Sequence, residues 1–543
     1  MNCERPFLSM SRRGLLQGSA AGLAVIASGP AALGASPPEE GTPKRGGTLP
    51  FAIAAEPPTY DLHATATFAV LQRVAPHYST LLQYKQHAYP QLVGDAAESW
   101  NSAPDQLTHT FKLRQGILFH DGTPLTSEDV KATYDRIRNP PDGVVSSRQE
   151  SLAKVQSIET PDPLTVVFHM NEVDASFILE VCASPWNALY SAARLRKDPN
   201  FPAHNVMGSG PFKFVEHVAG SHWVGARFDG YFRPGRPYLD GFRAITMSRP
   251  ATLSGMEGGQ ILGEFRGFTP AERDRLVRGM GKNANVQEDN FLLHSDISFN
   301  PQRKPFDDPR VRKALSLAID RWGGGKALGR ISFLQDVGGV MMPGGAWAAT
   351  DEELAKLPGF GRDMAASRTE ARRLLKEAGA ENLKLTLLNR NIDPFTTAGV
   401  YAIDQWRQIG VSVEHQEIEM ANYYASISGG GFDAVVDAYT DYEDDPTTGL
   451  VKFLSAEKWP VSSVKFTDPV LDDLYAKQAR TVDKAARLQA VRQFEARVLE
   501  QSYVVPVLWW HRIVVLNASV KGWTMSPSDM IYQDLADIWL APA

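Results

Sequence analysis

One stretch of the sequence, from Phe111 to Arg138, constrains the fold more tightly than any other. Apolar and polar residues alternate from Leu107 to Leu113, which is typical of a strand with one buried face. The pair Asp121-Gly122 follows and favours a tight turn, because glycine adopts positive φ without steric cost. This first part therefore predicts a strand that leads into a turn.

The second part of the stretch predicts a helix with a defined start. Thr126 and Asp129 have the spacing of a capping box, which satisfies free N–H groups of the first turn and places an acid at the positive helix end. Val130, Tyr134 and Ile137 then lie on one helix face. Together the two parts pack a strand, a turn and a capped amphipathic helix into one short segment.

This stretch resembles the signature of the bacterial extracellular solute-binding proteins of family 5, the dipeptide-, oligopeptide- and nickel-binding components of ABC importers. Further motifs of that family occur in its order, and the resemblance covers residues 45 to 540. One departure is Leu62, which stands where the family usually has proline. The further motifs are Glu56–His63, Gly208–Phe214, Asn300-Pro301, Phe306–Leu315 and the pair Asp445-Pro446.

Length and charge exclude several classes of protein. A chain of 543 residues is too long for one ordinary core, so we expect at least two lobes. The composition, 43% hydrophobic and 22% charged, is that of a soluble globular protein. The formal net charge is −6, and without a basic excess to neutralise phosphates we expect no nucleic-acid partner. We also expect no stable membrane insertion, because no segment beyond the N-terminal region is long and apolar enough.

The N-terminus has the pattern of an export signal. Ser11–Leu16 contains two adjacent arginines and resembles a twin-arginine signal, and a weakly apolar run follows from Gly18 to Leu33. An ordinary Sec signal is the alternative, because it can also carry arginines before an apolar run. We predict a twin-arginine signal peptide at residues 1–35, a Pro/Gly-rich linker at 36–46 and a periplasmic location.

Cysteine usage and motif searches favour no catalytic or metal site. Cys3 precedes the apolar run, so it cannot be the acylated cysteine of a lipoprotein. Cys182 alone would remain after cleavage, and one cysteine forms neither an internal disulfide nor a thiolate-ligated metal site. Gly323–Ala327 departs from a phosphate-binding loop, and no H-E-x-x-H motif occurs. We therefore predict no catalytic residue, no metal and no cofactor.

The resemblance implies an α/β, two-lobe periplasmic binding protein fold of class II with an extra subdomain. The chain would cross twice between the lobes in strand-like segments near Leu293–Asn300 and Pro506–Ile513, and this pair of crossovers would form a hinge. A strand, a helix and a second strand between Leu385 and Ile418 independently favour parallel pairing. The predicted limits are 47–295 with 512–543 for lobe I, 60–207 for its extra subdomain and 296–511 for lobe II.

The strongest candidate site is the acidic segment from Tyr439 to Pro446, which follows a predicted strand at Phe432–Ala438. Loops at the carboxyl ends of strands bind ligands in open α/β sheets. In peptide-binding members of the family a matching loop holds the α-ammonium group of the substrate, a role that suits a carboxylate. Candidate contacts are Tyr439, Asp441, Asp444 and Asp445, and which acid faces the cleft stays open. The alternative is an acidic surface loop without a ligand.

Five further residues are candidate ligand contacts. Arg390 ends a strand before a helix and could hold a carboxylate, or it could be a solvated arginine. Trp509 and Trp510 lie near the second crossover, where successive side chains face opposite sides, so one would be core and one could line the cleft. Tyr60 and His63 could border the cleft, although a lone histidine is more often a structural residue.

These features predict a periplasmic substrate-binding protein of an ABC transporter that captures a short peptide between two lobes and delivers it to the permease subunits. It would act without making or breaking bonds and as a monomer. The alternatives are a binding protein for a nickel chelate, an opine or a glycoside, an exported hydrolase, or a chaperone-like or sensor protein.

Overall fold

The computed structural model describes residues 41–459 and 465–542. The predicted signal peptide at 1–35 and residues 36–40 of the predicted linker lie outside these ranges. Pro43–Ala543 forms one compact unit. Within the described ranges, no helix combines the length and the apolar character needed to span a bilayer.

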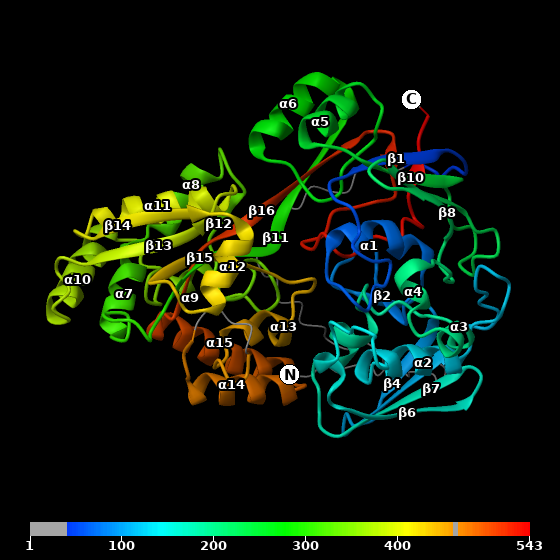
Figure 1. Cartoon of the computed structure of the whole chain (residues 1–543), viewed down its shortest axis with the longest axis horizontal. Coiled ribbons are helices and arrows are strands. Elements are labelled where there is room, and N and C mark those ends of the chain that lie inside the picture. The colour runs from blue at the N-terminus through cyan, green and yellow to red at the C-terminus, as the bar shows by residue number, and fades with distance from the viewer. Residues whose placement is uncertain (1–40, 460–464, 543) are drawn as a thin grey trace, which may run out of the picture. The chain divides into compact units, whose positions relative to one another are not determined.

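Two long antiparallel strands form the centre of this unit. β11 covers Ala284–Phe299 and β16 covers Val504–Asn517, and they pair over most of their length. The register of this pairing shifts between Asn290 and His294. Figure 1 shows the two strands running side by side. These strands are the two strand-like crossovers that the sequence predicts.

β11 and β16 belong to a six-stranded sheet with the order β12-β16-β11-β15-β13-β14. β13 pairs in parallel with both β14 and β15, so the predicted parallel pairing is confirmed. The remaining strands are β12 (Leu334–Asp336), β13 (Lys384–Arg390), β14 (Ser412–Ile418) and β15 (Ala434–Thr440).

Helices pack against this sheet and contribute side chains to two hydrophobic cores. One core includes residues of α7 (Pro309–Ala318), α8 (Arg321–Leu328), α10 (Met364–Glu377) and α11 (Phe395–Arg407). A second includes residues of α13 (Pro446–Leu450), the 3₁₀ turn Val451–Phe453, α14 (Pro469–Arg480) and α15 (Lys484–Gln501). Two further helices are α9 (Asp351–Leu354) and α12 (Met420–Ser428).

The N-terminal half builds a four-stranded sheet with the order β1-β10-β9-β8, in which β1 and β10 are parallel. Its strands are β1 (Thr48–Ile53), β8 (Phe212–Val218), β9 (His222–Arg227) and β10 (Gly241–Thr246). Associated elements are α1 (Phe68–Val74), α5 (Arg249–Glu257), α6 (Pro270–Met280), the 3₁₀ turns Ala75–His77 and Gly281–Asn283, and the short pair β17 (Val520–Lys521) and β18 (Trp539–Leu540).

A second four-stranded sheet, β4-β5-β7-β6, has its own buried core and lies in sequence between β1 and β8. Its strands are β4 (Ala97–Ser102), β5 (Thr108–Leu113), β6 (Val155–Asp162) and β7 (Thr165–Met170), with the hairpin β2 (Leu82–Tyr84) and β3 (Leu92–Gly94) preceding them. Its helical elements are α2 (Ser127–Arg138), the 3₁₀ turn Glu150–Leu152, the π-helical turn Phe177–Cys182, α3 (Ala192–Lys197) and α4 (Phe201–His204).

The two long strands pass from one hydrophobic core into another. Phe291 and Trp510 pack in the core shared by the six-stranded sheet and α7. Val286 packs against the core of α5 and α6, and Val514 belongs to the core of the β1-β10-β9-β8 sheet. The segment 293–299, where the sequence predicts the first crossing, pairs with β15, so the change of core precedes it. The lobe limits at 295/296 and 511/512 stay a prediction.

Helix α2 begins where the sequence predicts. Thr126 is the N-cap and Asp129 completes the capping box, with its Oδ2 accepting a hydrogen bond from the Thr126 N–H at 2.8 Å. The other oxygen, Oδ1, accepts from the N–H of Ala192 at the start of α3, also at 2.8 Å. Asp129 is buried, so one carboxylate satisfies the beginnings of two helices.

Replacing this carboxylate should destabilise the chain. Asp129→Ala leaves two N–H groups without their acceptor, so we expect it to lower the free energy of unfolding by about 1–3 kcal/mol. Denaturant titration measures this value. The matched control is Glu128→Ala, because Glu128 is exposed in the same helical turn, and its effect should stay within about 0.5 kcal/mol. Equal stability of the two variants would contradict this role of Asp129.

Candidate functional site

The carboxyl ends of β13, β14 and β15 lie at one edge of the six-stranded sheet, because these strands run in the same direction. β13 ends at Arg390, and β15 ends at Thr440, directly before the acidic segment. Such an edge is where open α/β sheets bind ligands. It therefore brings together the two candidate groups of opposite charge, Arg390 and the acids at 441–445.

Arg390 is buried and held among aromatic rings. Its Nη2 donates to Asp437 Oδ1 at 3.0 Å, and its Nη1 donates to the Tyr424 hydroxyl at 3.3 Å. The guanidinium carbon lies 3.9 Å from the Phe395 ring centroid and 4.5 Å from that of Tyr423. The alternative of a solvated arginine is therefore wrong, because only 4% of Arg390 is exposed. Its Nε has no hydrogen-bond partner among the described residues.

Two acids of the loop already have a cation of the chain as partner. The Lys452 ammonium lies 2.9 Å from Asp441 Oδ2, and both side chains are largely buried. Asp445 is the N-cap of α13 and receives both terminal nitrogens of Arg487, at 2.7 and 2.9 Å. Asp445 is fully buried, so its carboxylate serves the fold of this segment.

The other two acids contact the β2–β3 hairpin region. The Tyr84 hydroxyl donates to Glu443 Oε2 at 3.0 Å, and the Asp444 N–H donates to the Tyr89 hydroxyl at 3.0 Å. Asp444 Oδ2 also accepts from the N–H of Ala346 at 3.1 Å. Their remaining oxygens, Glu443 Oε1 and Asp444 Oδ1, are buried without a hydrogen-bond partner among the described residues.

Glu443 is the acid that the sequence reasoning missed. It is only 1% exposed, so a solvent-exposed loop does not describe this segment. Nothing in the local sequence distinguishes Glu443 from its acidic neighbours, because the distinction comes from Tyr84, far away in the chain. The signal that could have found it is its position inside the acidic segment beside Asp444.

Burial changes the protonation of these groups. It raises the pKa of Glu443 well above its ordinary value, and the nearby carboxylates of Asp445 and Glu180 raise it further. Burial likewise raises the pKa of Asp444 to about 7 and that of Glu180 to about 8. Glu180 belongs to the same surroundings, because its main-chain carbonyl accepts from the Tyr442 hydroxyl at 3.0 Å. A cationic group arriving among these acids would favour their ionised forms.

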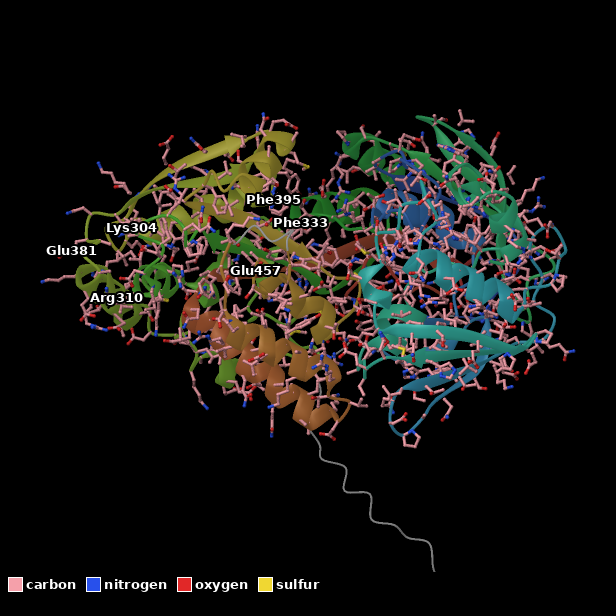
Figure 2. All side chains as sticks on the ribbon, turned by 60° about the horizontal axis from the view of Figure 1, so that its bottom comes forward. Lys304, Arg310, Phe333, Glu381, Phe395 and Glu457 are labelled. Carbon is pink, nitrogen blue, oxygen red and sulfur yellow. The ribbon has the colours of Figure 1, made fainter. Side chains whose placement is uncertain are left out.

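Both tryptophan candidates are buried, and a ligand contact by either of them stays a prediction. Trp509 is buried, with Nε1 donating to the Gly339 carbonyl at 3.0 Å, and Trp510 Nε1 donates to Ser295 Oγ at 2.9 Å. They belong to different clusters, which confirms that they face opposite sides of β16. The Trp510 ring lies 5.5 Å from Phe333 and 5.8 Å from Phe395, both labelled in Figure 2.

Tyr439 lies next to the Asp441–Lys452 pair. The Lys452 ammonium is 5.1 Å from the Tyr439 ring centroid, and the ring also packs on Phe453. Tyr439 is also the register partner of His294 in β11, and the centroids of these two rings lie 5.9 Å apart. The ring therefore lies among groups of β11 and the 3₁₀ turn at the predicted edge of the sheet.

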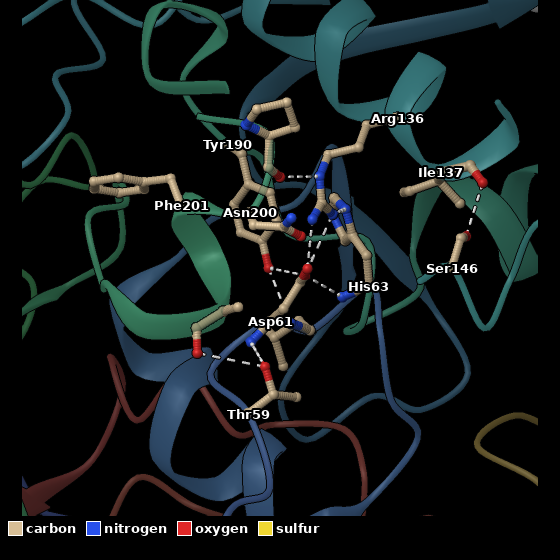
Figure 3. Close-up of polar contacts among 12 residues, drawn as sticks. Thr59, Asp61, His63, Arg136, Ile137, Ser146, Tyr190, Asn200 and Phe201 are labelled. Atoms are coloured by element: carbon tan, nitrogen blue, oxygen red, sulfur yellow. Dashed lines mark hydrogen bonds and ion pairs between the residues drawn. The ribbon is translucent and has the colours of Figure 1, made fainter. Parts of the chain in front are cut away.

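His63 belongs to a buried polar cluster instead of standing free (Figure 3). Its Nδ1 accepts from Arg136 Nη1 at 3.0 Å, and its Nε2 donates to the Ala188 carbonyl at 3.0 Å. Arg136 also pairs with Asp61 at 2.5 Å, and the Tyr190 hydroxyl donates to Asp61 at 3.1 Å. Burial lowers the pKa of His63 to about 3, so the ring is neutral. This geometry favours a structural role for His63 over a ligand contact.

Tyr60 is engaged as well. Its hydroxyl hydrogen-bonds His217 Nδ1 at 2.7 Å, and its ring packs edge-on against Trp223 at 4.9 Å. The residue is half-buried beside the core of the β1-β10-β9-β8 sheet. A ligand contact by Tyr60 stays a prediction. No group of three or more His, Cys, Asp or Glu side chains could hold a metal ion in the described part of the chain.

Breaking the buried Asp61–Arg136 pair should be costly. Asp61→Ala leaves the Arg136 guanidinium buried without its counter-charge, so we expect a loss of about 3–5 kcal/mol in the free energy of unfolding. The control is Asp351→Ala, which breaks the exposed pair with Arg362 and should cost less than about 1 kcal/mol. Denaturant titration measures both, and equal losses would contradict the structural role of this cluster.

Glu443 should make stability depend on pH. Folding raises the pKa of this carboxyl above the value near 4.5 that it has in the unfolded chain. The carboxyl therefore lowers the free energy of unfolding at pH values above 4.5, and this loss grows until the pH reaches the pKa of the folded state. Glu443→Gln removes this loss and keeps an acceptor for Tyr84. We expect the variant to be more stable than the wild type at pH about 8, by about 1–3 kcal/mol, with the difference vanishing near pH 4.5. Denaturant titration across this range is the measurement. A pH-independent difference would show that the raised pKa of Glu443 is not its cause.

Comparison with known proteins agrees with this fold. The sequence model of the bacterial extracellular solute-binding proteins, family 5, matches residues 91–460. The glutathione-binding protein GsiB of Escherichia coli O1:K1 is 26% identical over 453 residues, which cover 81% of this chain and 85% of that protein. The name of the family and the name of this relative both denote binding proteins.

Solved structures show the same architecture. DppA of Helicobacter pylori, in complex with the peptide STSA, superposes with a TM-score of 0.75 at 22% identity, covering 92% of this chain and 98% of that one. AgaA of A. tumefaciens R10, in complex with agropinic acid, gives 0.74 at 25% identity, covering 92% and 99%. The fold is thus the two-lobe α/β fold of periplasmic binding proteins, with β11 and β16 as the crossovers. Since the family model matches more than half of the sequence, the chain belongs to the bacterial extracellular solute-binding proteins of family 5.

Proposed function

We propose that this solute-binding protein captures a short peptide between its lobes in the periplasm and delivers it to an ABC permease. The observation that supports it most is Glu443, a buried acid whose Oε1 has no hydrogen-bond partner among the described residues. The Oδ1 atom of the neighbouring Asp444 is likewise buried without one in that part of the chain. Family membership and the glutathione-binding relative support this proposal, since glutathione is itself a short peptide. Export by the twin-arginine route and a monomeric state are parts of the same proposal.

The ammonium end of the ligand would meet Glu443 and Asp444. Asp441 and Asp445 already form ion pairs with Lys452 and Arg487, which leaves the other two acids for an external cation. An ammonium group would supply the hydrogen bonds that Glu443 Oε1 and Asp444 Oδ1 lack, and it would compensate their charge. Because burial favours the protonated acids, binding of a cation would release protons.

The carboxylate end of the ligand would lie toward Arg390. This guanidinium is fixed by Asp437 and by the flanking rings of Phe395 and Tyr423, so little side-chain entropy is lost on binding. Its Nε is the donor without a partner among the described residues. The Trp510, Phe333 and Phe395 rings extend from this arginine and offer an apolar surface for a ligand side chain.

Binding would favour the closed arrangement of the lobes. The acidic loop follows β15, while Tyr84 and Tyr89 come from the β2–β3 hairpin region, so one site joins segments of both predicted lobes. A ligand shifts this equilibrium only by its differential affinity for the closed form. A permease that recognises the closed form would then distinguish loaded from empty protein.

A peptide screen tests the proposal. Thermal unfolding is followed with di- to pentapeptides, and we expect a subset to stabilise the chain by about 2.7 kcal/mol at a hundredfold excess over the dissociation constant. Glu443→Gln should weaken this binding at least tenfold, about 1.4 kcal/mol, although the same change raises the stability of the empty protein. Glu128→Gln, an exposed acid on α2, is the control and should bind as the wild type does. A flat screen across all peptides would contradict a peptide ligand.

One observation favours a second candidate, a ligand without a free α-ammonium group such as an opine. Lys452 neutralises Asp441, so part of the acidic loop is closed to an external cation. AgaA, solved with agropinic acid, covers nearly the whole chain at 25% identity. N-acetylated peptides and agropinic acid in the same screen separate the candidates. Stabilisation by these blocked ligands, unaffected by Glu443→Gln, would support the second candidate and reject the first.

A further inference from the structure

A cavity of about 300 Å³ lies on the other face of the β2–β3 hairpin from the acidic loop. Gln83 and Val93, which are register partners in this hairpin, line the cavity. The next residue, Tyr84, contacts Glu443 of the acidic loop. Successive side chains of a strand point to opposite faces, so the cavity and the acidic loop are separate sites.

Arg114 forms one wall of the cavity and is fixed by main-chain groups. Its Nε donates to the Asp95 carbonyl at 2.8 Å, and its Nη2 donates to the Gly94 carbonyl at 3.2 Å. No described residue accepts a hydrogen bond from its Nη1. The side chain therefore keeps a donor for another group while its position is set by two hydrogen bonds.

Arg236 and Arg233 also line the cavity and belong to the loop after β9. Arg236 Nε donates to Asp537 Oδ1 at 2.5 Å, and its guanidinium lies 4.2 Å from the Tyr238 ring centroid. Both terminal nitrogens of Arg236 lack a hydrogen-bond partner within the described ranges. In Arg233, by contrast, both terminal nitrogens form ion pairs, Nη1 with Asp534 at 3.3 Å and Nη2 with Asp537 at 2.8 Å. Arg233 thus anchors the loop, and Arg236 offers donors.

The acids behind these arginines do not cancel the positive charge. Burial raises the pKa of Asp95 to about 7 and also raises the pKa of Asp534. Although burial acts in the same direction on Asp537, Arg233 and Arg236 hold its pKa below the ordinary value. Near neutral pH the three guanidinium groups therefore share the Asp534 and Asp537 carboxylates that pair with Arg233, and Asp95 is only partly ionised, which leaves an excess of positive charge.

We propose that this cavity is a second binding site, separate from the ligand cleft, for a small anion with two or more negative charges, a phosphate or a di- or tricarboxylate. The volume is at the lower end for small-molecule sites and suits such an anion. The planar donors of Arg114 and Arg236 match the oxygens of carboxylate and phosphate groups. Both side chains are held in place by the chain itself, so binding needs little reorganisation.

Titration calorimetry with citrate and with inorganic phosphate tests the site. The measurements use sodium chloride at matched ionic strength as the reference, which removes general salt effects. We expect saturable binding of at least one of the two anions to the wild type. Arg114→Gln combined with Arg236→Gln should weaken it tenfold or more, and Arg233 is left intact because it anchors the loop. Arg236→Lys keeps the charge but loses the planar donors, so it provides a milder test if the double variant folds poorly.

Two controls make the outcome decisive. Arg407→Gln removes an exposed arginine of α11 and should leave anion binding unchanged. Glu443→Gln should weaken the cleft ligand but not the anion, which separates this inference from the proposed function. The absence of saturable binding by both anions, or equal affinity in wild type and Arg114/Arg236 variants, would overturn the proposal.

Discussion

The pairing of β11 with β16 is the interaction on which the other features depend. Each strand contributes side chains to more than one hydrophobic core, as Phe291 and Val286 do on β11. The hydrogen bonds between the strands are continuous except for register shifts, the larger one between Asn290 and His294. Two strands that share one ladder restrict the relative movement of the cores to bending at this segment. We therefore expect the predicted lobes to move relative to each other by bending at this segment.

The position of the candidate site follows from this arrangement. β15 pairs with β11, so its carboxyl end and the acidic loop lie beside the crossover strands. Two of the four acids serve the chain itself through Lys452 and Arg487. Glu443 and Asp444 instead contact tyrosines from the β2–β3 hairpin region, which is far away along the chain. The two acids without a cationic partner, Glu443 and Asp444, thus lie where two parts of the chain meet.

Local features of the sequence were predictable, and distant partners were not. Thr126 begins helix α2 as predicted, because a cap depends on residues within one turn. The predicted strand at Phe432–Ala438 proved to be β15, two residues further along. By contrast, the burial of Arg390 depends on Tyr423 and Asp437, and the role of Glu443 depends on Tyr84. The involvement of His63 with Arg136 is equally non-local, so the sequence left its role open.

A ligand at the acidic loop should close the lobes about the β11–β16 pair. Single-molecule energy transfer between labels at Val215 of β8 and Val400 of α11, both exposed, tests it most directly. Cys182 is buried and should not compete for the labels. We expect a ligand from the screen to shift the distance distribution to shorter values in wild type and not in Glu443→Gln at the same concentration. An unchanged distribution in wild type saturated with a bound ligand would contradict it.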